Sequence, residues 1–187
     1  MATVATRTGY FETGLEILAD LGFRGLKLSQ VCQRLGVTTG SFYHYFPSWS
    51  TYTRELVEHW RQDRTVRLHD LFRSEPDPRR RMAIIIREVL ALPHSAEAAI
   101  RAWSSVDPEV HRVQAEVDRE RFDVCLEYAL EIVGDQRQAE VFASWAVYLL
   151  VGYEQANLDR DPAVYQWISN QILDALDAGR FATVPPR

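Results

Sequence analysis

The sequence predicts an all-α protein. Apolar residues recur at helical spacing nearly throughout the 187 residues, and no stretch combines sustained period-two alternation with β-branched enrichment. Prolines and glycines fall where helices would start and stop. Apolar residues make up 47% of the chain and charged residues 25%, a composition typical of a globular protein with a substantial core.

The helical patterns can be followed in order along the chain. Gly22 and Gly36 are expected to end the first two helices, Thr38 to cap the third and Ser48 to cap the fourth. Residues 74–78 (SEPDP) form the clearest break, and the final TVPPR is expected to fray. The expected helices cover about residues 8–21, 29–35, 38–44, 49–72, 79–91, 95–106, 108–133, 136–157 and 162–178.

The run VTTGSFYHYF, residues 37–46, puts five aromatic rings beside a helical glycine. Two short helices joined by a glycine-containing turn, with a helix before them as a brace, form a helix-turn-helix. Phe42 and Phe46 are four residues apart and are expected to share the inward face. Tyr43 and His44 are then expected to face solvent or DNA, because the second helix of this motif enters the major groove.

Small groups surround these aromatic residues. Thr38, Thr39 and Ser41 carry short hydroxyls that can bond phosphate oxygens or base edges, and Gly40 allows close approach of the backbone. Thr38 is as well explained by capping alone.

The segment GFRGLKLSQVCQRLGVTTGSFYHYFPS, residues 22–48, resembles the DNA-binding module of the tetracycline-repressor (TetR) family. The resemblance implies a homodimer of about nine helices per chain. A DNA-binding domain, residues 1–48, would be joined by a long helix to a ligand-binding and dimerisation body, residues 49–187. In that family a small molecule in the body releases the operator.

The match has departures. Lys27 stands where the family often has Ser or Thr, while Thr39 and Trp49 stand where Lys is frequent. Two cations are therefore missing, which predicts weaker non-specific binding to DNA. We expect Trp49 to pack at the start of its helix, and leave Tyr45 unassigned. The residues expected to contact DNA are Lys27, Thr38, Thr39, Gly40, Ser41, Tyr43 and His44.

Large aromatic side chains of the body are candidates for lining a largely apolar ligand pocket, although ordinary core or dimer contact explains any single one of them better. These are Trp60, Trp103, Tyr128, Trp145, Tyr148 and Tyr153. The last two long helices are more apolar than one buried stripe requires, which favours a four-helix dimer interface over a buried monomer core. The surplus residues are Trp145, Leu149, Tyr153, Trp167, Ile168 and Ile172.

Charge and motifs exclude other classes. The net charge of −5 argues against a broadly basic coat, and Arg79, Arg80 and Arg81 are better explained as a solvated helix start than as a DNA patch. Cys32 and Cys125 are expected as buried thiols. We expect no metal, cofactor, catalytic group or membrane span, and a cytoplasmic protein.

The sequence therefore predicts a ligand-responsive transcriptional regulator, most simply a repressor. It would bind a palindromic double-stranded DNA operator as a dimer and release it when a small, mostly hydrophobic effector binds. The alternatives are an all-α enzyme or ligand-binding protein with the same architecture, which turnover of a cofactor would reveal, and a regulator without an effector. A ligand screen without hits, while DNA binding persists, would indicate the latter.

Overall fold

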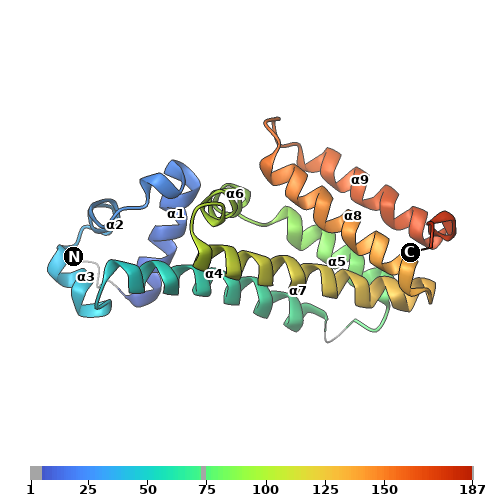
Figure 1. Ribbon diagram of the computed structural model, residues 1–187, viewed down its shortest axis with the longest axis horizontal. Helices are drawn as coiled ribbons and strands as arrows, with labels where there is room; N and C mark the ends of the chain where they lie inside the picture. Colours follow the sequence, from blue (N-terminus) through green and yellow to red (C-terminus); the bar gives the residue numbers. More distant parts are fainter. Residues whose placement is uncertain (1–5, 73–74, 187) are drawn as a thin grey trace. The chain divides into compact units, whose positions relative to one another are not determined.

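The computed structural model describes residues 6–72 and 75–186, and it describes side chains in these ranges except for residues 64–72. The described residues contain nine α-helices, one 3-10 helix and no strand, so the all-α prediction is confirmed for them (Figure 1). The elements are α1 Arg7–Gly25, α2 Leu28–Leu35, α3 Thr39–Tyr45, α4 Trp49–Phe72, α5 Pro78–Leu90, α6 His94–Ser104, α7 Pro108–Val133, α8 Gln136–Gln155, α9 Pro162–Asp177 and η1 Arg180–Thr183.

The chain forms two compact units. Unit 1 comprises Met1–Arg64 and Pro93–Ala115, and unit 2 comprises Thr65–Leu92 and Glu116–Arg187. The start of α4, all of α6 and the start of α7 therefore pack with the three N-terminal helices. The expected boundary between a DNA-binding domain and the body after residue 48 stays a prediction.

Unit 1 is organised around α1, which packs along α6 and α2. Gly22 interrupts α1 with φ of 66°, in the left-handed region expected from the sequence, and helical backbone resumes up to Gly25. The largest fully buried side chains of this unit come from α1, α2, α3, α4 and α6, and from the position directly after α3. They are Trp60, Tyr10, Tyr52, Phe42, Phe46, Ile17, Leu18, Leu56, Ile100, Glu97 and Val31.

Unit 2 has its core among α5, α7, α8, α9 and η1. In this unit α9 packs on α5, α8 and η1 (Figure 1). Buried members of this core include Met82, Cys125, Tyr128, Ala129, Phe142, Ile172, Leu173, Leu176 and Phe181.

The final TVPPR was predicted to fray, and this was wrong for Val184 and Pro185. Phe181 is buried in η1, and Val184 packs against the core of unit 2. Arg137 Nε also donates to the Pro185 carbonyl oxygen at 3.3 Å. The hydrophobic contacts of Phe181 and Val184 with residues distant in sequence fix a segment whose composition alone indicates a loop.

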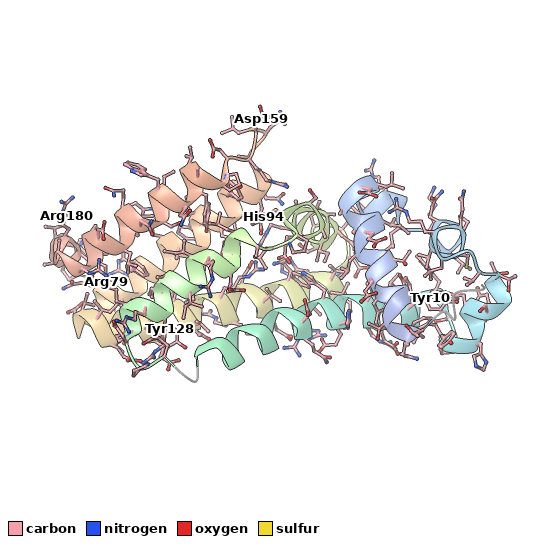
Figure 2. All side chains as sticks on the ribbon, turned by 180° about the vertical axis from the view of Figure 1, so that it is seen from behind. Tyr10, Arg79, His94, Tyr128, Asp159 and Arg180 are labelled. Atoms are coloured by element: carbon pink, nitrogen blue, oxygen red, sulfur yellow. The ribbon has the colours of Figure 1, made fainter. Side chains whose placement is uncertain are left out.

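The arginines at the start of α5 are engaged by acidic groups of unit 2. Arg79 pairs with Asp174 at 3.0 Å, and Arg81 pairs with Glu131 at 2.9 Å. The guanidinium of Arg81 also lies 4.6 Å from the ring centroid of Tyr128, whose position Figure 2 shows. These contacts fit a helix start rather than a DNA patch.

Cys32 and Cys125 are both buried free thiols, as expected. Among the helices described by the structure, none combines the length and apolar character needed to cross a lipid bilayer.

Candidate nucleic-acid interface

The turn between α2 and α3 is built by Gly36. Gly36 has φ of 66° and ψ of 32°, a left-handed conformation that glycine adopts without a steric penalty. Its N–H donates to the Gln33 carbonyl at 3.2 Å, and the N–H of Val37 donates to the Cys32 carbonyl at 3.0 Å. This pair of hydrogen bonds is a Schellman motif, which ends α2 and directs the chain into α3.

The start of α3 is capped by Thr38, as predicted. The Thr38 hydroxyl oxygen accepts a hydrogen bond from the Ser41 backbone N–H at 3.2 Å. Thr38 is exposed, and its O–H remains able to donate while its oxygen accepts. Capping and a contact to a phosphate oxygen are therefore compatible for this side chain.

The inward face of α3 is aromatic. Phe42 and Phe46 are both fully buried, and they contact Tyr10 of α1 with ring centroids 5.7 and 5.5 Å apart. Both rings also contact Tyr52 of α4, at 5.3 and 5.0 Å. Figure 2 shows Tyr10 on the side of α1 that faces α3. Packing on two other helices therefore sets which face of α3 points outward.

The outward face of α3 carries the predicted DNA-contacting residues. Thr39, Gly40 and His44 are exposed, Tyr43 is 52% exposed, and Ser41 is half-buried. The ring of Tyr43 rests edge-on against Phe42, with centroids 5.4 Å apart. This face thus presents hydroxyl groups, a phenol and an imidazole, all of which can bond to phosphate oxygens or base edges.

Lys27 lies apart from α3, at the N-cap position of α2. It is exposed and makes no side-chain capping bond. Its ammonium group is therefore available to solvent or to a phosphate.

Gly40 has open space where a side chain would begin. A Cβ built there would have Thr38 Oγ1 as its nearest neighbour, at 3.7 Å, which is an ordinary van der Waals distance. Nothing within unit 1 requires glycine at this position. A requirement for glycine would have to come from a molecule outside the chain.

A buried hydrogen bond joins α4 to α1, the two helices on which α3 packs. The Tyr52 hydroxyl donates to the Tyr10 carbonyl oxygen at 2.8 Å, and burial raises the pKa of Tyr52, so the group stays protonated as a donor. Gly14 makes room for it, because a Cβ there would collide with the Tyr52 hydroxyl and lie 2.9 Å from Leu56 Cδ2.

Trp49 packs at the start of α4, as expected. Its ring contacts Phe42 at 6.0 Å and Tyr52 at 5.0 Å. Tyr45, which the sequence left unassigned, is half-buried with its ring 5.3 Å from that of Tyr10.

No sequence pattern selects Arg7 as a functional residue. Its Nη1 donates to the Tyr45 carbonyl oxygen at 2.8 Å, and its Nη2 pairs with Glu55. Its guanidinium also lies 4.7 Å from the ring centroid of Phe46. These partners are 38 and more residues away in sequence, so no local pattern could have indicated them.

The candidate pocket residues fall in both units. Trp60 and Trp103 belong to unit 1, where Trp60 is fully buried and Trp103 is half-buried. In unit 2, Tyr128 is buried in the core, whereas Trp145 is 47% and Tyr148 is 72% exposed. A pocket in the body stays a prediction. Among the six candidates, Tyr128 is the only one in unit 2 that is buried, since Tyr153 is half-buried.

The residues predicted for the dimer interface differ in their exposure to solvent. Trp145 and Trp167 are exposed, at 47% and 64%, and Leu149, Tyr153 and Ile168 are half-buried. Tyr153 packs on Tyr165, with ring centroids 4.7 Å apart. In unit 2, the exposed apolar residues that the prediction did not place in the dimer interface are Tyr148, Leu158 and Val164.

The assignment of Ile172 to surplus apolar surface is wrong. Its side chain is 5% exposed in the single chain and belongs to the core of unit 2. Ile172 follows Ile168 by one helical turn, on the face of α9 that its own subunit covers.

Comparison with known proteins supports the helix-turn-helix assignment. Residues 11–49 match the family model described as "Bacterial regulatory proteins, tetR family". No curated protein sequence matches the chain.

Solved structures share the whole fold. A putative transcriptional regulator from Pseudomonas aeruginosa PAO1 aligns with a TM-score of 0.75 and 16% identity, over 96% of this chain and 93% of that one. A putative transcriptional regulator from Saccharomonospora viridis, in complex with choline, aligns with a TM-score of 0.77 and 15% identity, over 90% of this chain and 95% of that one. The transcriptional regulator FadR from Bacillus subtilis, in complex with stearoyl-CoA, aligns with a TM-score of 0.70 and 14% identity, over 93% of this chain and 99% of that one.

Proposed function

Through its residues 11–49 this chain belongs to the tetR family of bacterial regulatory proteins, and we propose that it is a dimeric, effector-released repressor. In this proposal α3 reads a palindromic operator in the major groove. The protein acts in the cytoplasm, where its operator lies.

The observation that carries the proposal is the two-sided character of α3. Phe42 and Phe46 anchor one face with no exposed surface, while Tyr43 and the backbone at Gly40 face outward. An exposed tyrosine on a helix held by its other face can bond phosphate oxygens or base edges. We assign phosphate contacts to Lys27 and Thr38 and contacts to sugar-phosphate or base edges to Thr39, Ser41, Tyr43 and His44.

The electrostatic contribution to this binding is small for such a protein. Thr39 and the packed Trp49 replace two cations common in the family, and the chain carries a net charge of −5. Each neutralised phosphate adds a salt-dependent increment to affinity. We therefore expect modest affinity for random DNA and a shallow dependence on salt.

Exposed aromatic residues on α8 and α9 support dimerisation. Trp145 and Tyr148 are three residues apart on α8, and Val164 and Trp167 are three apart on α9. Residues at this spacing share a helix face, and α8 and α9 pack together in unit 2. A second copy of this chain would cover these faces and hold two α3 helices for operator half-sites about 34–36 Å apart.

We propose a small, mostly hydrophobic effector that binds in the body. Two proteins of similar fold bind choline and stearoyl-CoA, which differ greatly in polarity, so the fold itself does not select one ligand class. Release follows from a population shift, in which the effector binds the conformation that does not fit the operator more tightly than the one that does.

The test is selection of bound fragments from random and genomic DNA at two salt concentrations, with Tyr43→Ala in parallel. A two-fold symmetric motif that is lost in the variant, while its unfolding transition is retained, supports the proposal. Absence of any enriched sequence at both salt concentrations would refute it.

A further inference from the structure

Resting on the proposed DNA-binding function, we propose that Arg7 is a positioning residue for α3. In this role it fixes the C-terminal end of α3 without touching DNA, and the preference for operator over random DNA depends on it. Three contacts of one guanidinium group carry this inference.

Arg7 connects three elements of unit 1. From the first turn of α1 its Nη1 donates to the backbone carbonyl of Tyr45, the last residue of α3, at 2.8 Å. Its Nη2 pairs with the carboxylate of Glu55 in α4, and its guanidinium lies over the ring of Phe46. The same side chain thus binds the end of α3, the residue after it and the helix that follows.

The end of α3 needs such a partner. The helix has seven residues, too few to be stable alone, and the last carbonyl groups of any helix lack partners within it. The Phe46 N–H already bonds the Phe42 carbonyl at 3.0 Å, but the Tyr45 carbonyl points to Arg7. A cation at this end also interacts favourably with the helix dipole.

Arginine suits this position better than lysine does. The planar guanidinium can donate from two nitrogens to Tyr45 and Glu55 while its flat face lies on Phe46. A lysine ammonium is a point charge and cannot stack in this way. Arg7→Lys should therefore restore the charge but only part of the positioning.

The competing role is a direct phosphate contact, since the Arg7 side chain is 48% exposed. The two roles differ in their dependence on salt. Loss of a phosphate contact weakens binding to all sequences and lowers the salt slope by about one. Loss of positioning weakens operator binding and leaves binding to random DNA and the slope unchanged.

The experiment compares full-length wild type, Arg7→Gln, Arg7→Lys and the control Arg34→Gln. Arg34 has a similar surface ion pair in the same unit, with Asp20 at 2.7 Å, and that pair joins α2 to α1 rather than to α3. Affinities for the selected operator and for a random duplex are measured at several salt concentrations. Protein concentrations are corrected for the active fraction, and hydrogen exchange of α3 is followed without DNA.

We expect Arg7→Gln to lower the ratio of operator to random affinity on the order of tenfold, comparable to one mismatched base pair. Arg7→Lys should recover part of this loss, Arg34→Gln should keep the wild-type ratio, and exchange should accelerate in α3 only in the Arg7 variants. If Arg7→Gln leaves the ratio of operator to random affinity unchanged, or weakens binding to all sequences with a lower salt slope, this inference is overturned while the proposed function stands. Wild-type protein that selects no sequence would instead refute the proposed function, and the inference with it.

Discussion

The indole Nε1 of Trp60 donates to the Glu97 carboxylate oxygen Oε1 at 2.6 Å, inside unit 1. Trp60 is fully buried and Glu97 is 2% exposed, so this bond joins α4 to α6 away from water. Hydrogen bonds in such a low-dielectric setting are electrostatically stronger than those at a surface.

Trp60→Phe should therefore destabilise the protein by on the order of 3 kcal/mol, because it removes a donor from a buried carboxylate and leaves a small cavity. Urea unfolding measures the change. Glu97→Gln keeps an acceptor for the indole and should cost less. Equal unfolding midpoints for wild type and Trp60→Phe would show that the bond contributes nothing.

Two glycines should respond oppositely to alanine. Gly40→Ala should leave stability unchanged or raise it by up to about 1 kcal/mol, since a Cβ has room there and alanine favours helix. It should nevertheless weaken operator binding. Gly14→Ala should destabilise by about 1–3 kcal/mol, because the added methyl collides with Tyr52. Thermal unfolding and DNA titration of both variants check this contrast, and full operator affinity in Gly40→Ala would contradict it.

Substitutions of the adjacent aromatic residues Phe42 and Tyr43 should affect folding and DNA binding separately. Phe42→Ala should cost about 3–5 kcal/mol of stability, because its ring is fully buried. Tyr43→Ala should cost less than about 1.5 kcal/mol, the range of one aromatic contact, yet abolish selective DNA binding. Chemical denaturation gives the stabilities. A Phe42→Ala protein as stable as Tyr43→Ala would invalidate the assigned faces of α3.

Trp167→Glu should dissociate the proposed dimer. Trp167 is 64% exposed on α9, and a central interface tryptophan contributes at least about 2 kcal/mol to association, or roughly 30-fold in the dissociation constant. Sedimentation over a range of concentrations measures this. Tyr43→Glu, which places the same charge at an exposed aromatic position of α3, should remain dimeric; equal behaviour of the two variants would reject the interface.

The Cys125 thiol should make the protein less stable in alkali. Burial raises the pKa of this thiol from 9.0 to about 12, so the folded chain keeps its proton where the unfolded chain has lost it. The free energy of unfolding therefore falls as the pH rises from about 9 towards 12, and the contribution is fully present below pH 9.

Between pH 8 and pH 10 the wild type should accordingly lose about 1 kcal/mol more than Cys125→Ala does. Urea unfolding of both proteins at the two pH values gives the difference, in which other titrating groups cancel. Parallel pH dependences would mean that Cys125 ionises equally in both states.

Local sequence determined the elements of this protein and the inward face of α3. Gly36 terminates α2 and Thr38 caps α3 through atoms within a few residues, and the four-residue spacing of Phe42 and Phe46 assigns the inward face before any tertiary contact is known. Such short-range interactions depend on residue type and spacing alone, so they can be read along the chain.

Tertiary structure decided what the same residue types do when their partners are distant. Arg7 contacts Tyr45 and Glu55, and Trp60 bonds to Glu97. Val184 packs on the core of unit 2 although its segment was expected to fray. Ile172 lies in the core rather than on an exposed face for the same reason. Apolar spacing shows that a side chain needs cover, but which surface covers it depends on how helices meet in space, and that is set by the packing of the whole unit.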